Sequence, residues 1–179
     1  MRGYFGVGVE NISKPMNLGN LQRSAHAFGA AFFFTIASQI EGRQIRYADT
    51  SDSPDHLPTY HYGSVEELRL PQRCRLVGVE LTDDAVDLPR FPHPVAAAYL
   101  LGPERGSLSP EALARCEAVV KIPTRFCVNL GVAGAIVLYD RHLSLGPYGE
   151  RGAGGRIPGA PPGGHVSGGP VLRRRRQGA

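Results

Sequence analysis

The chain has 179 residues, 42% of them hydrophobic and 20% charged, with a formal net charge of +4. This balance is typical of one globular domain with a tail, and no apolar run approaches the ~20 residues of a membrane-spanning helix. Six arginines face one glutamate in residues 146–179, so the rest of the chain is close to neutral and can bind nucleic acid only through a local basic patch.

The three cysteines, Cys74, Cys116 and Cys127, are odd in number and far apart. Their spacing matches neither a disulfide framework nor a metal site. The residues after Met1 enter a strand-like sequence directly and contain no apolar signal-peptide region. We therefore expect a cytoplasmic protein that contains no disulfide and binds no metal.

The N-terminal part predicts a strand, a helix and a second strand. The first strand covers residues 4–10 and contains two glycines in a Gly-x-Gly pattern. That pattern lacks the third glycine and the acidic residue of a dinucleotide-binding fingerprint. A helix is expected to begin near Asn17 and to end at Gly29, and the apolar run over 30–36 predicts a strand that is covered on both faces.

The middle of the chain is more polar. Residues 37–63 are expected to form a long binding loop or lid rather than a second domain. A serine and a glutamate at capping-box spacing predict a short helix near 64–69. A strand over 75–81 follows, and a connection rich in proline and aspartate covers 83–94.

The last elements complete an alternation of strands and helices. A strand is expected over 95–101, followed by a helix that begins after Ser109, with proline at its first position. A strand over 118–122 leads into a helix over 129–143, whose first residue is an asparagine, a favoured cap. The alternation predicts an α/β fold with a mostly parallel sheet in residues 1–145.

Residues 146–179 are rich in glycine and proline and poor in apolar residues. Such a composition buries too little surface to offset chain entropy, so we predict a disordered tail. The cluster from Arg173 to Arg176 can either contact RNA phosphates or remain a solvated end, and the sequence leaves both open.

The segment 122–140 combines the end of a buried strand, a short polar loop and a helix of small residues. Glycine weakens a helix, so two of them in one helix suggest that another element approaches closely. The arrangement resembles a ligand site at the carboxyl end of a strand in an α/β sheet. An ordinary buried strand-loop-helix unit is the alternative.

Three segments, each at a strand-to-helix junction, carry a resemblance to a known family: Asn17-Leu-Gly-Asn-Leu-Gln-Arg23, Leu101-Gly-Pro-Glu-Arg-Gly-Ser-Leu108 and Ile122-Pro-Thr-Arg-Phe-Cys-Val-Asn-Leu130. In order and spacing they resemble the three motifs of the SpoU (TrmH-like) group of SPOUT-class RNA 2'-O-ribose methyltransferases. The resemblance covers about residues 4–143. Within that group the chain is similar in size to the minimal tRNA methyltransferases.

The resemblance implies a Rossmann-like sheet whose C-terminal segment forms a deep trefoil knot, a rare exception to ordinary chain topology. It also implies a homodimer that transfers a methyl group from S-adenosylmethionine to a ribose 2'-hydroxyl of RNA, with tRNA as the expected substrate. This chemistry requires orientation of the donor and activation of the hydroxyl, and it requires no metal.

The same resemblance assigns four catalytic residues: Arg23, Asn17, Glu104 and Asn129. A guanidinium is very hard to deprotonate, so we expect Arg23 to orient and polarise the hydroxyl rather than to act as a free base. Asn17 and Asn20 are expected to support Arg23, with plain helix capping as the alternative for both. A solvated surface acid is the alternative for Glu104.

The residues implied to bind the donor are Val79, Glu80, Leu101, Gly102, Gly106, Ile122, Cys127, Asn129 and Leu130. Adenosine is expected against the apolar strand ends at Leu100, Leu101 and Ile122. Cys127 stands where many relatives have serine. A thiol is a weak hydrogen-bonding group, so we expect backbone atoms at this position to contact the donor.

Alternatives to this function remain open. One alternative is a non-catalytic RNA-binding member of the same fold. The presence of Asn17, Arg23, Glu104 and Asn129 disfavours it, whereas Cys127 in place of the usual serine keeps it open. The substrate can also be rRNA rather than tRNA. A nicotinamide-dependent enzyme is disfavoured because the fingerprint is incomplete. The sequence does not identify which RNA or which nucleotide is modified.

Overall fold

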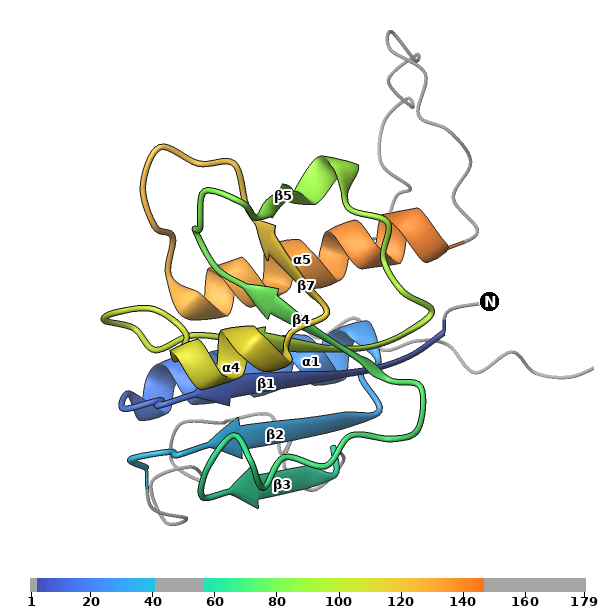
Figure 1. Cartoon of the computed structure of the whole chain (residues 1–179). Coiled ribbons are helices and arrows are strands. Elements are labelled where there is room, and N and C mark those ends of the chain that lie inside the picture. The colour runs from blue at the N-terminus through green and yellow to red at the C-terminus, as the bar shows by residue number, and fades with distance from the viewer. Residues whose placement is uncertain (1–2, 41–56, 147–179) are drawn as a thin grey trace, which may run out of the picture. The chain divides into compact units, whose positions relative to one another are not determined.

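The computed structural model describes residues 3–40 and 57–146, which contain one seven-stranded sheet and the helices around it (Figure 1). The strands are β1 (Tyr4–Glu10), β2 (Phe32–Ile36), β3 (Thr59–Tyr62), β4 (Arg75–Val79), β5 (Val86–Asp87), β6 (Ala96–Leu101) and β7 (Ala118–Lys121). The helices are α1 (Pro15–Phe28), the 3-10 helix η1 (Leu88–Arg90), α4 (Pro110–Arg115) and α5 (Leu130–Leu145).

The strand order is β3-β2-β1-β6-β4-β7-β5, and every pairing within the described ranges is parallel. Parallel neighbours require crossover connections, which here carry the helices to the two faces of the sheet. The predicted α/β fold with a parallel sheet is confirmed. No helix in the described residues is long and apolar enough to cross a membrane.

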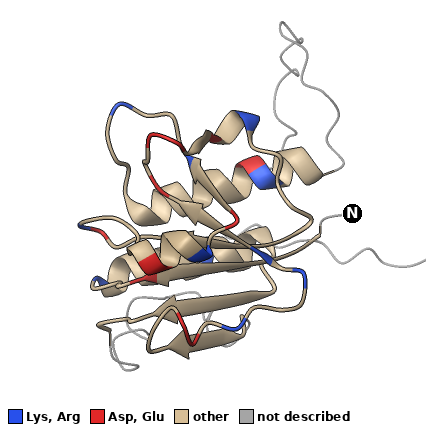
Figure 2. Cartoon of the chain, in the orientation of Figure 1, with Lys and Arg blue, Asp and Glu red and all other residues tan. Residues whose placement is uncertain are grey.

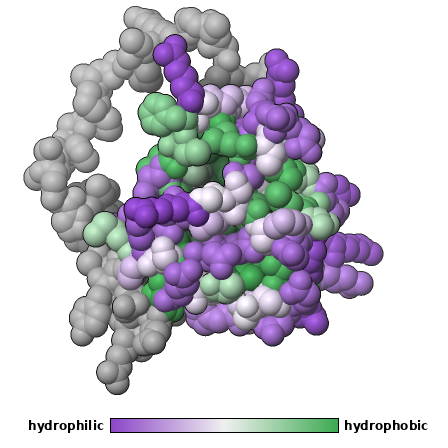
Figure 3. Space-filling model, turned by 60° about the vertical axis from the view of Figure 1, so that its left-hand side comes forward, coloured by the Kyte–Doolittle hydropathy of each residue, from purple (hydrophilic) through white to green (hydrophobic). Residues whose placement is uncertain are grey.

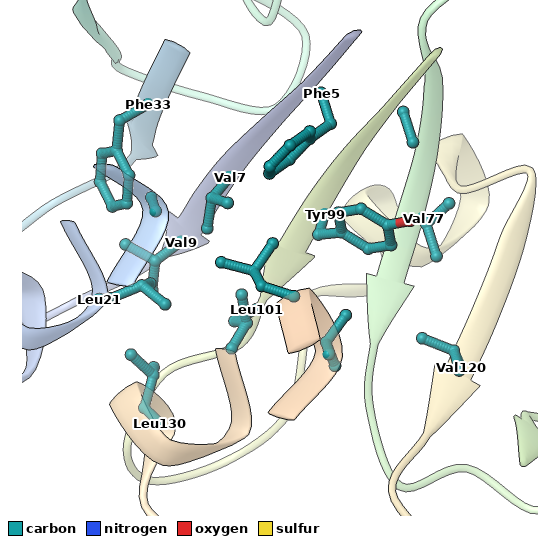
Figure 4. Packing of buried hydrophobic residues seen from close by; sticks show 14 of the residues in the cluster. Phe5, Val7, Val9, Leu21, Phe33, Val77, Tyr99, Leu101, Val120 and Leu130 are labelled. Atoms are coloured by element: carbon teal, nitrogen blue, oxygen red, sulfur yellow. The ribbon is translucent and has the colours of Figure 1, made fainter. Parts of the chain in front are cut away.

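One face of the sheet packs against α1 and α5. Alternate strand residues point to this face, as the two-residue period of a strand requires. Phe5, Val7 and Val9 of β1 enter this core together with Leu21 of α1 and Leu130 of α5 (Figure 4). The carboxyl ends of the strands are thereby fixed relative to the first turn of α5.

The opposite face is covered by α4 and by the segment before β4. Phe34 of β2 and Leu100 of β6 lie in this second core with Ala112 of α4. The rings of β2 lie over the glycines of β1, and a Cβ at Gly8 would lie 2.2 Å from the Phe34 ring. The Gly-x-Gly pattern of the first strand is therefore a packing requirement of the sheet.

The close approach that the small residues of α5 predict is confirmed, and the neighbouring element is α1. A Cβ at Gly134 would lie 2.2 Å from Cδ1 of Leu21. A Cβ at Gly131 would lie 3.1 Å from Cβ of Asn20. These glycines bring the two helices together within one chain.

A buried polar network connects β6 with α5. Arg141 donates from Nη1 to the hydroxyl oxygen of Tyr99 at 3.1 Å. The Tyr99 hydroxyl donates its own proton to Nδ1 of His93 at 2.6 Å when the neutral His93 ring is protonated on Nε2. Nε2 of His93 lies 2.9 Å from Oδ2 of Asp140 and therefore carries the ring proton. Burial, the largest influence, lowers the pKa of His93, and Arg141 adds to this shift against the opposing effect of Asp140.

Several predicted boundaries move by one or two residues, and one predicted helix is wrong. Residues 65–67 form only a turn. The Glu67 carboxylate accepts from the N–H of Gly63 at 2.8 Å, and Val65 and Leu68 are buried in the second core. Packing of these two apolar side chains therefore determines the local structure, and the capping pattern alone does not produce a helix.

The predicted loop over 37–63 ends in strand β3, which pairs with β2. Most of this expected lid, residues 41–56, lies outside the described residues. The predicted connection over 83–94 likewise contains β5 and η1. β3 is a half-exposed edge strand and β5 has two residues, so neither carries a continuous apolar run.

Candidate active site

A cavity of about 300 Å³ opens at the carboxyl edge of the sheet, beyond the ends of β4, β6 and β7. Figure 3, turned toward this edge, shows an apolar hollow bordered by hydrophilic residues. The predicted donor-binding residues all line the cavity: Val79, Glu80, Leu101, Gly102, Gly106, Ile122, Cys127, Asn129 and Leu130. Three of the four predicted catalytic residues, Asn17, Glu104 and Asn129, line it as well.

Some lining residues were not predicted: Lys14, Leu81, Pro103, Lys121, Thr124, Val128 and Ala133. All of them lie within three residues of a predicted one, so widening each motif would have found them. The expected contact of adenosine with Leu100 is wrong. Leu100 points to the opposite face and packs in the core beside α4, whereas Leu101 faces the cavity.

A chain of side-chain hydrogen bonds joins the three motif segments. Oδ1 of Asn129 accepts from the N–H of Gly131 at 2.9 Å and thereby caps α5. Its Nδ2 donates to Oδ1 of Asn17 at 3.0 Å, and Nδ2 of Asn17 donates to Oε1 of Glu104 at 3.1 Å. Because an amide donates only from nitrogen, the cap fixes the orientation of every member, and Glu104 must accept.

The environment of Glu104 favours its ionised form. Partial burial, the largest single influence, raises the pKa of Glu104, but the hydrogen bonds around it outweigh burial and lower the pKa overall. Besides Asn17, the hydrogen-bond donors to Glu104 are the backbone N–H of Ser13 at 3.3 Å, the hydroxyl of Ser13 at 3.1 Å and the backbone N–H of Lys14 at 3.0 Å. Glu104 thus holds the loop after β1 against the loop after β6, which argues against a purely solvated surface acid.

Two further carboxylates fix the loop between β6 and α4. Glu80 accepts from the N–H of Leu108 at 2.8 Å with one oxygen and from that of Leu81 at 2.8 Å with the other. Glu10, which is buried, accepts from the N–H and the hydroxyl of Ser109 at 2.8 and 2.6 Å. The side chain of Glu80 therefore fixes the wall of the cavity, and its role in binding the methyl donor stays a prediction.

The three cysteines occupy different environments. Burial raises the pKa of Cys74 and of Cys116 to about 11, so both remain thiols near neutral pH. Cys127 is exposed and lines the cavity. Among the described residues, no group of histidine, cysteine or acidic side chains is arranged to hold a metal ion.

Arg23 lies outside the cavity, in a neighbouring groove between α1 and α5. The groove is also lined by Asn20, which was expected to support Arg23, and by the exposed side chain of Val132. Asn129 lines both the groove and the cavity. The two sites therefore meet at the N-cap of α5, and within one chain Arg23 is not part of the cavity wall.

The cavity combines apolar strand ends with carboxylates that are already hydrogen-bonded to backbone N–H groups. This environment suits orientation of a small ligand more than covalent catalysis by the protein.

A profile of the SpoU rRNA Methylase family matches residues 5–139. The chain belongs to this family. The resemblance of its three motif segments to SpoU enzymes is thereby confirmed.

This chain has relatives in the SpoU family that differ widely in length. It is 29% identical over 146 residues to a tRNA (guanosine(18)-2'-O)-methyltransferase of Mus musculus, a match that covers 75% of this chain and 9% of the mouse protein. It is 27% identical over 157 residues to the tRNA (guanosine(18)-2'-O)-methyltransferase of Thermus thermophilus, covering 79% of this chain and 77% of that one. The chain thus spans less than a tenth of the mouse relative and about three quarters of the bacterial one.

The fold is shared with solved SpoU structures. AviRb from Streptomyces viridochromogenes, in complex with the cofactor AdoMet, superposes with a TM-score of 0.67. The two sequences are 24% identical over 78% of this chain and 59% of that one. This likeness supports the α/β architecture of the SpoU family for the described residues.

Proposed function

We propose that this protein transfers a methyl group from S-adenosylmethionine to a ribose 2'-hydroxyl of RNA, with tRNA as the substrate. The observation that carries the proposal is the convergence of the three motif segments on one cavity through the hydrogen bonds of Asn129, Asn17 and Glu104. The names of the mouse and Thermus relatives support tRNA, and the family description leaves rRNA as the alternative.

The cavity residues fit this donor. Leu101 and Ile122 offer apolar surface to an adenine ring, and Gly102 allows close approach of backbone to ligand. Bound S-adenosylmethionine would supply an electrophilic methyl on a sulfonium. The protein then has to hold S-adenosylmethionine in one orientation and to orient the ribose 2'-hydroxyl toward its methyl group.

Arg23 is proposed to orient the ribose through its neighbouring phosphate. An arginine guanidinium is a cation that presents several N–H donors in a rigid plane, a geometry that matches a phosphate. The groove that holds Arg23 adjoins the cavity at Asn129. In a dimer packed through this groove, an RNA phosphate bound by Arg23 of one chain would bring the 2'-hydroxyl of its nucleotide toward the methyl donor in the cavity of the other chain.

Homodimer formation is part of the proposal. Val132 and Tyr139 on α5, which are 49% and 46% exposed, line the same groove as Arg23. A second subunit on this face would cover these side chains and bring Arg23 of one chain toward the cavity of the other. Sedimentation of the wild type and of Val132→Asp tests this, with a dimer expected only for the wild type.

We further propose that residues 1–145 form the methyltransferase domain, that their C-terminal segment forms the trefoil knot, and that the protein is cytoplasmic. The predicted disordered tail, 146–179, lies outside the described residues. A chain that ends at Gly146 should melt at the same temperature as the full chain, because α5 ends at Leu145. A crystal structure of the dimer tests the knot, and cell fractionation tests the location.

Transfer of tritium from labelled S-adenosylmethionine tests the function directly. Purified protein is incubated with unmodified tRNA and, in parallel, with rRNA, and acid-insoluble counts are measured. We expect counts in tRNA only. Counts in rRNA alone would show that rRNA, and not tRNA, is the substrate. Binding of S-adenosylmethionine without transfer to either RNA would favour a non-catalytic RNA-binding protein.

A further inference from the structure

The two most exposed large apolar side chains of the described residues lie beside the cavity. Phe126 is 79% exposed and Met16 is 72% exposed. Phe126 stands between two lining residues, Thr124 and Cys127, and does not line the cavity itself. Single exposed apolar side chains are ordinary on protein surfaces, so the place of this ring beside the cavity and near basic residues is what indicates a nucleic-acid partner.

The loop around Phe126 is ordered by its own hydrogen bonds. The hydroxyl of Thr124 donates to the carbonyl of Phe126 at 2.8 Å, and the N–H of Thr124 donates to the carbonyl of Ile122 at 2.8 Å. These bonds form a tight turn directly after β7. The turn fixes the backbone of Phe126 while the ring remains exposed, so exposure is a property of a defined loop conformation.

Basic side chains lie on the loops that border the cavity, beside the acidic residues Glu80 and Glu104. Arg125 and Arg105 are exposed on the two loops that border the cavity, and Lys14 lines its entrance. Figure 2 shows basic positions on the loop that joins β7 to α5 and on the loop that joins β6 to α4. The carboxylates of Glu80 and Glu104 are occupied by N–H donors. An exposed aromatic ring among cations is the pattern that binds single-stranded nucleic acid.

We propose that the ring of Phe126 stacks on an unpaired nucleobase of the RNA, next to the ribose that enters the cavity. The inference rests on the proposed function and adds a base-recognition residue to it. Enzymes that draw a nucleotide out of its stack often receive the displaced base against aromatic or apolar side chains. Phe126 supplies such a side chain at the cavity entrance.

The experiment compares Phe126→Ala, Phe126→Leu and Phe126→Tyr with the wild type. Affinity for unmodified tRNA is measured by fluorescence anisotropy, KM for tRNA by methyl transfer, and donor affinity by calorimetry. Removing a stacked ring should weaken tRNA binding and raise KM by roughly tenfold, with donor affinity and melting temperature unchanged. Tyrosine should retain wild-type values, whereas leucine should resemble alanine.

Val95→Ala provides the matched control. Val95 is 56% exposed and immediately precedes β6, at the end of the sheet opposite the cavity. Trimming it removes exposed apolar surface of similar kind, and its tRNA affinity should equal that of the wild type.

Three results would overturn the inference. A loss of donor affinity in Phe126→Ala would make the ring a cover of the donor, and a loss of dimer in sedimentation would make it a subunit contact. Wild-type tRNA affinity in Phe126→Leu would show that no stacking is involved. If the wild type transfers no methyl, the proposed function fails, and the anisotropy measurements still decide whether the ring binds RNA.

Discussion

The side chains of Asn129 and Asn17, 112 residues apart in the chain, are joined by a 3.0 Å hydrogen bond from Nδ2 of the first to Oδ1 of the second. Because Asn129 also caps α5 with its carbonyl oxygen, its amide has only one orientation that satisfies both partners. That orientation makes Asn17 a donor to Glu104. The helix cap, the first motif and the second motif therefore act as one unit at the edge of the cavity.

Two substitutions of Asn129 distinguish its role as the cap of α5 from its hydrogen bond to Asn17. Asn129→Asp keeps a side chain that caps well but cannot donate to Asn17, so it should lose only the stability of that hydrogen bond, while affinity for S-adenosylmethionine and methyl transfer fall. Asn129→Ala should lose the cap as well, which costs about 1 kcal/mol of unfolding free energy. Chemical denaturation and calorimetric titration of the donor measure the two effects. Equal loss of stability in both variants would contradict the separation.

Glu80→Gln tests whether a carboxylate fixes the cavity wall. The amide retains one accepting oxygen and places an NH2 group against the N–H of either Leu81 or Leu108. Hydrogen bonds to charged groups contribute about 1.5–3 kcal/mol, so we expect donor affinity to fall roughly tenfold or more. Glu111→Gln, an exposed acid on α4, serves as the control and should bind the donor normally. Normal binding by Glu80→Gln would show that the loop holds its position without the carboxylate.

Gly8→Ala tests the packing of β1 against β2. The added Cβ would lie 2.2 Å from the Phe34 ring in a fully buried part of the sheet. Overpacking of this kind typically costs 1–3 kcal/mol of unfolding free energy. The double variant Gly8→Ala with Phe34→Leu should recover part of that loss, as a double-mutant cycle in urea would detect. Simple addition of the two single effects would mean that the ring is not what Gly8 accommodates.

His93 predicts a pH dependence of stability. In the folded state, burial and the charge of Arg141 lower the pKa of His93, against the opposing hydrogen bond and charge of Asp140. In the unfolded chain the pKa of histidine is about 6.5. The unfolded chain therefore binds more protons just below that pH, so the free energy of unfolding should fall as pH decreases from 7 to 5. His93→Gln should show a shallower decrease over the same range in urea titrations. An equally steep decrease would place the titrating group elsewhere.

The sequence predicts most of the cavity because its parts are local. Strand-to-helix junctions such as Val128-Asn129-Leu130 can be recognised from a strand end, a polar loop and a cap, and a parallel sheet brings such junctions to one edge. The contacts between segments are not local. From the sequence, Glu10 is predicted only as the last residue of a strand. Its burial is explained by the hydrogen bonds that its carboxylate accepts from Ser109, 99 residues away in the chain.

The errors have the same origin. The orientation of Leu100 depends on which face of β6 meets α4, and the turn at 65–67 depends on where Val65 and Leu68 pack. Strand β3 is recognisable only through its pairing with β2, because its two exposed residues, Tyr60 and His61, point to opposite faces and its sequence does not alternate between buried and exposed positions. In each case tertiary packing, absent from local pattern, decides the outcome.

Nucleoside analysis of tRNA after incubation with S-adenosylmethionine and either the wild type or Arg23→Ala tests the account most directly. The wild type should produce a 2'-O-methylated nucleoside. Arg23→Ala should produce none while binding the donor within about twofold of wild type, since Arg23 lies outside the cavity. Methylation of a base instead of a ribose, or equal loss of donor binding and transfer in Arg23→Ala, would contradict the account.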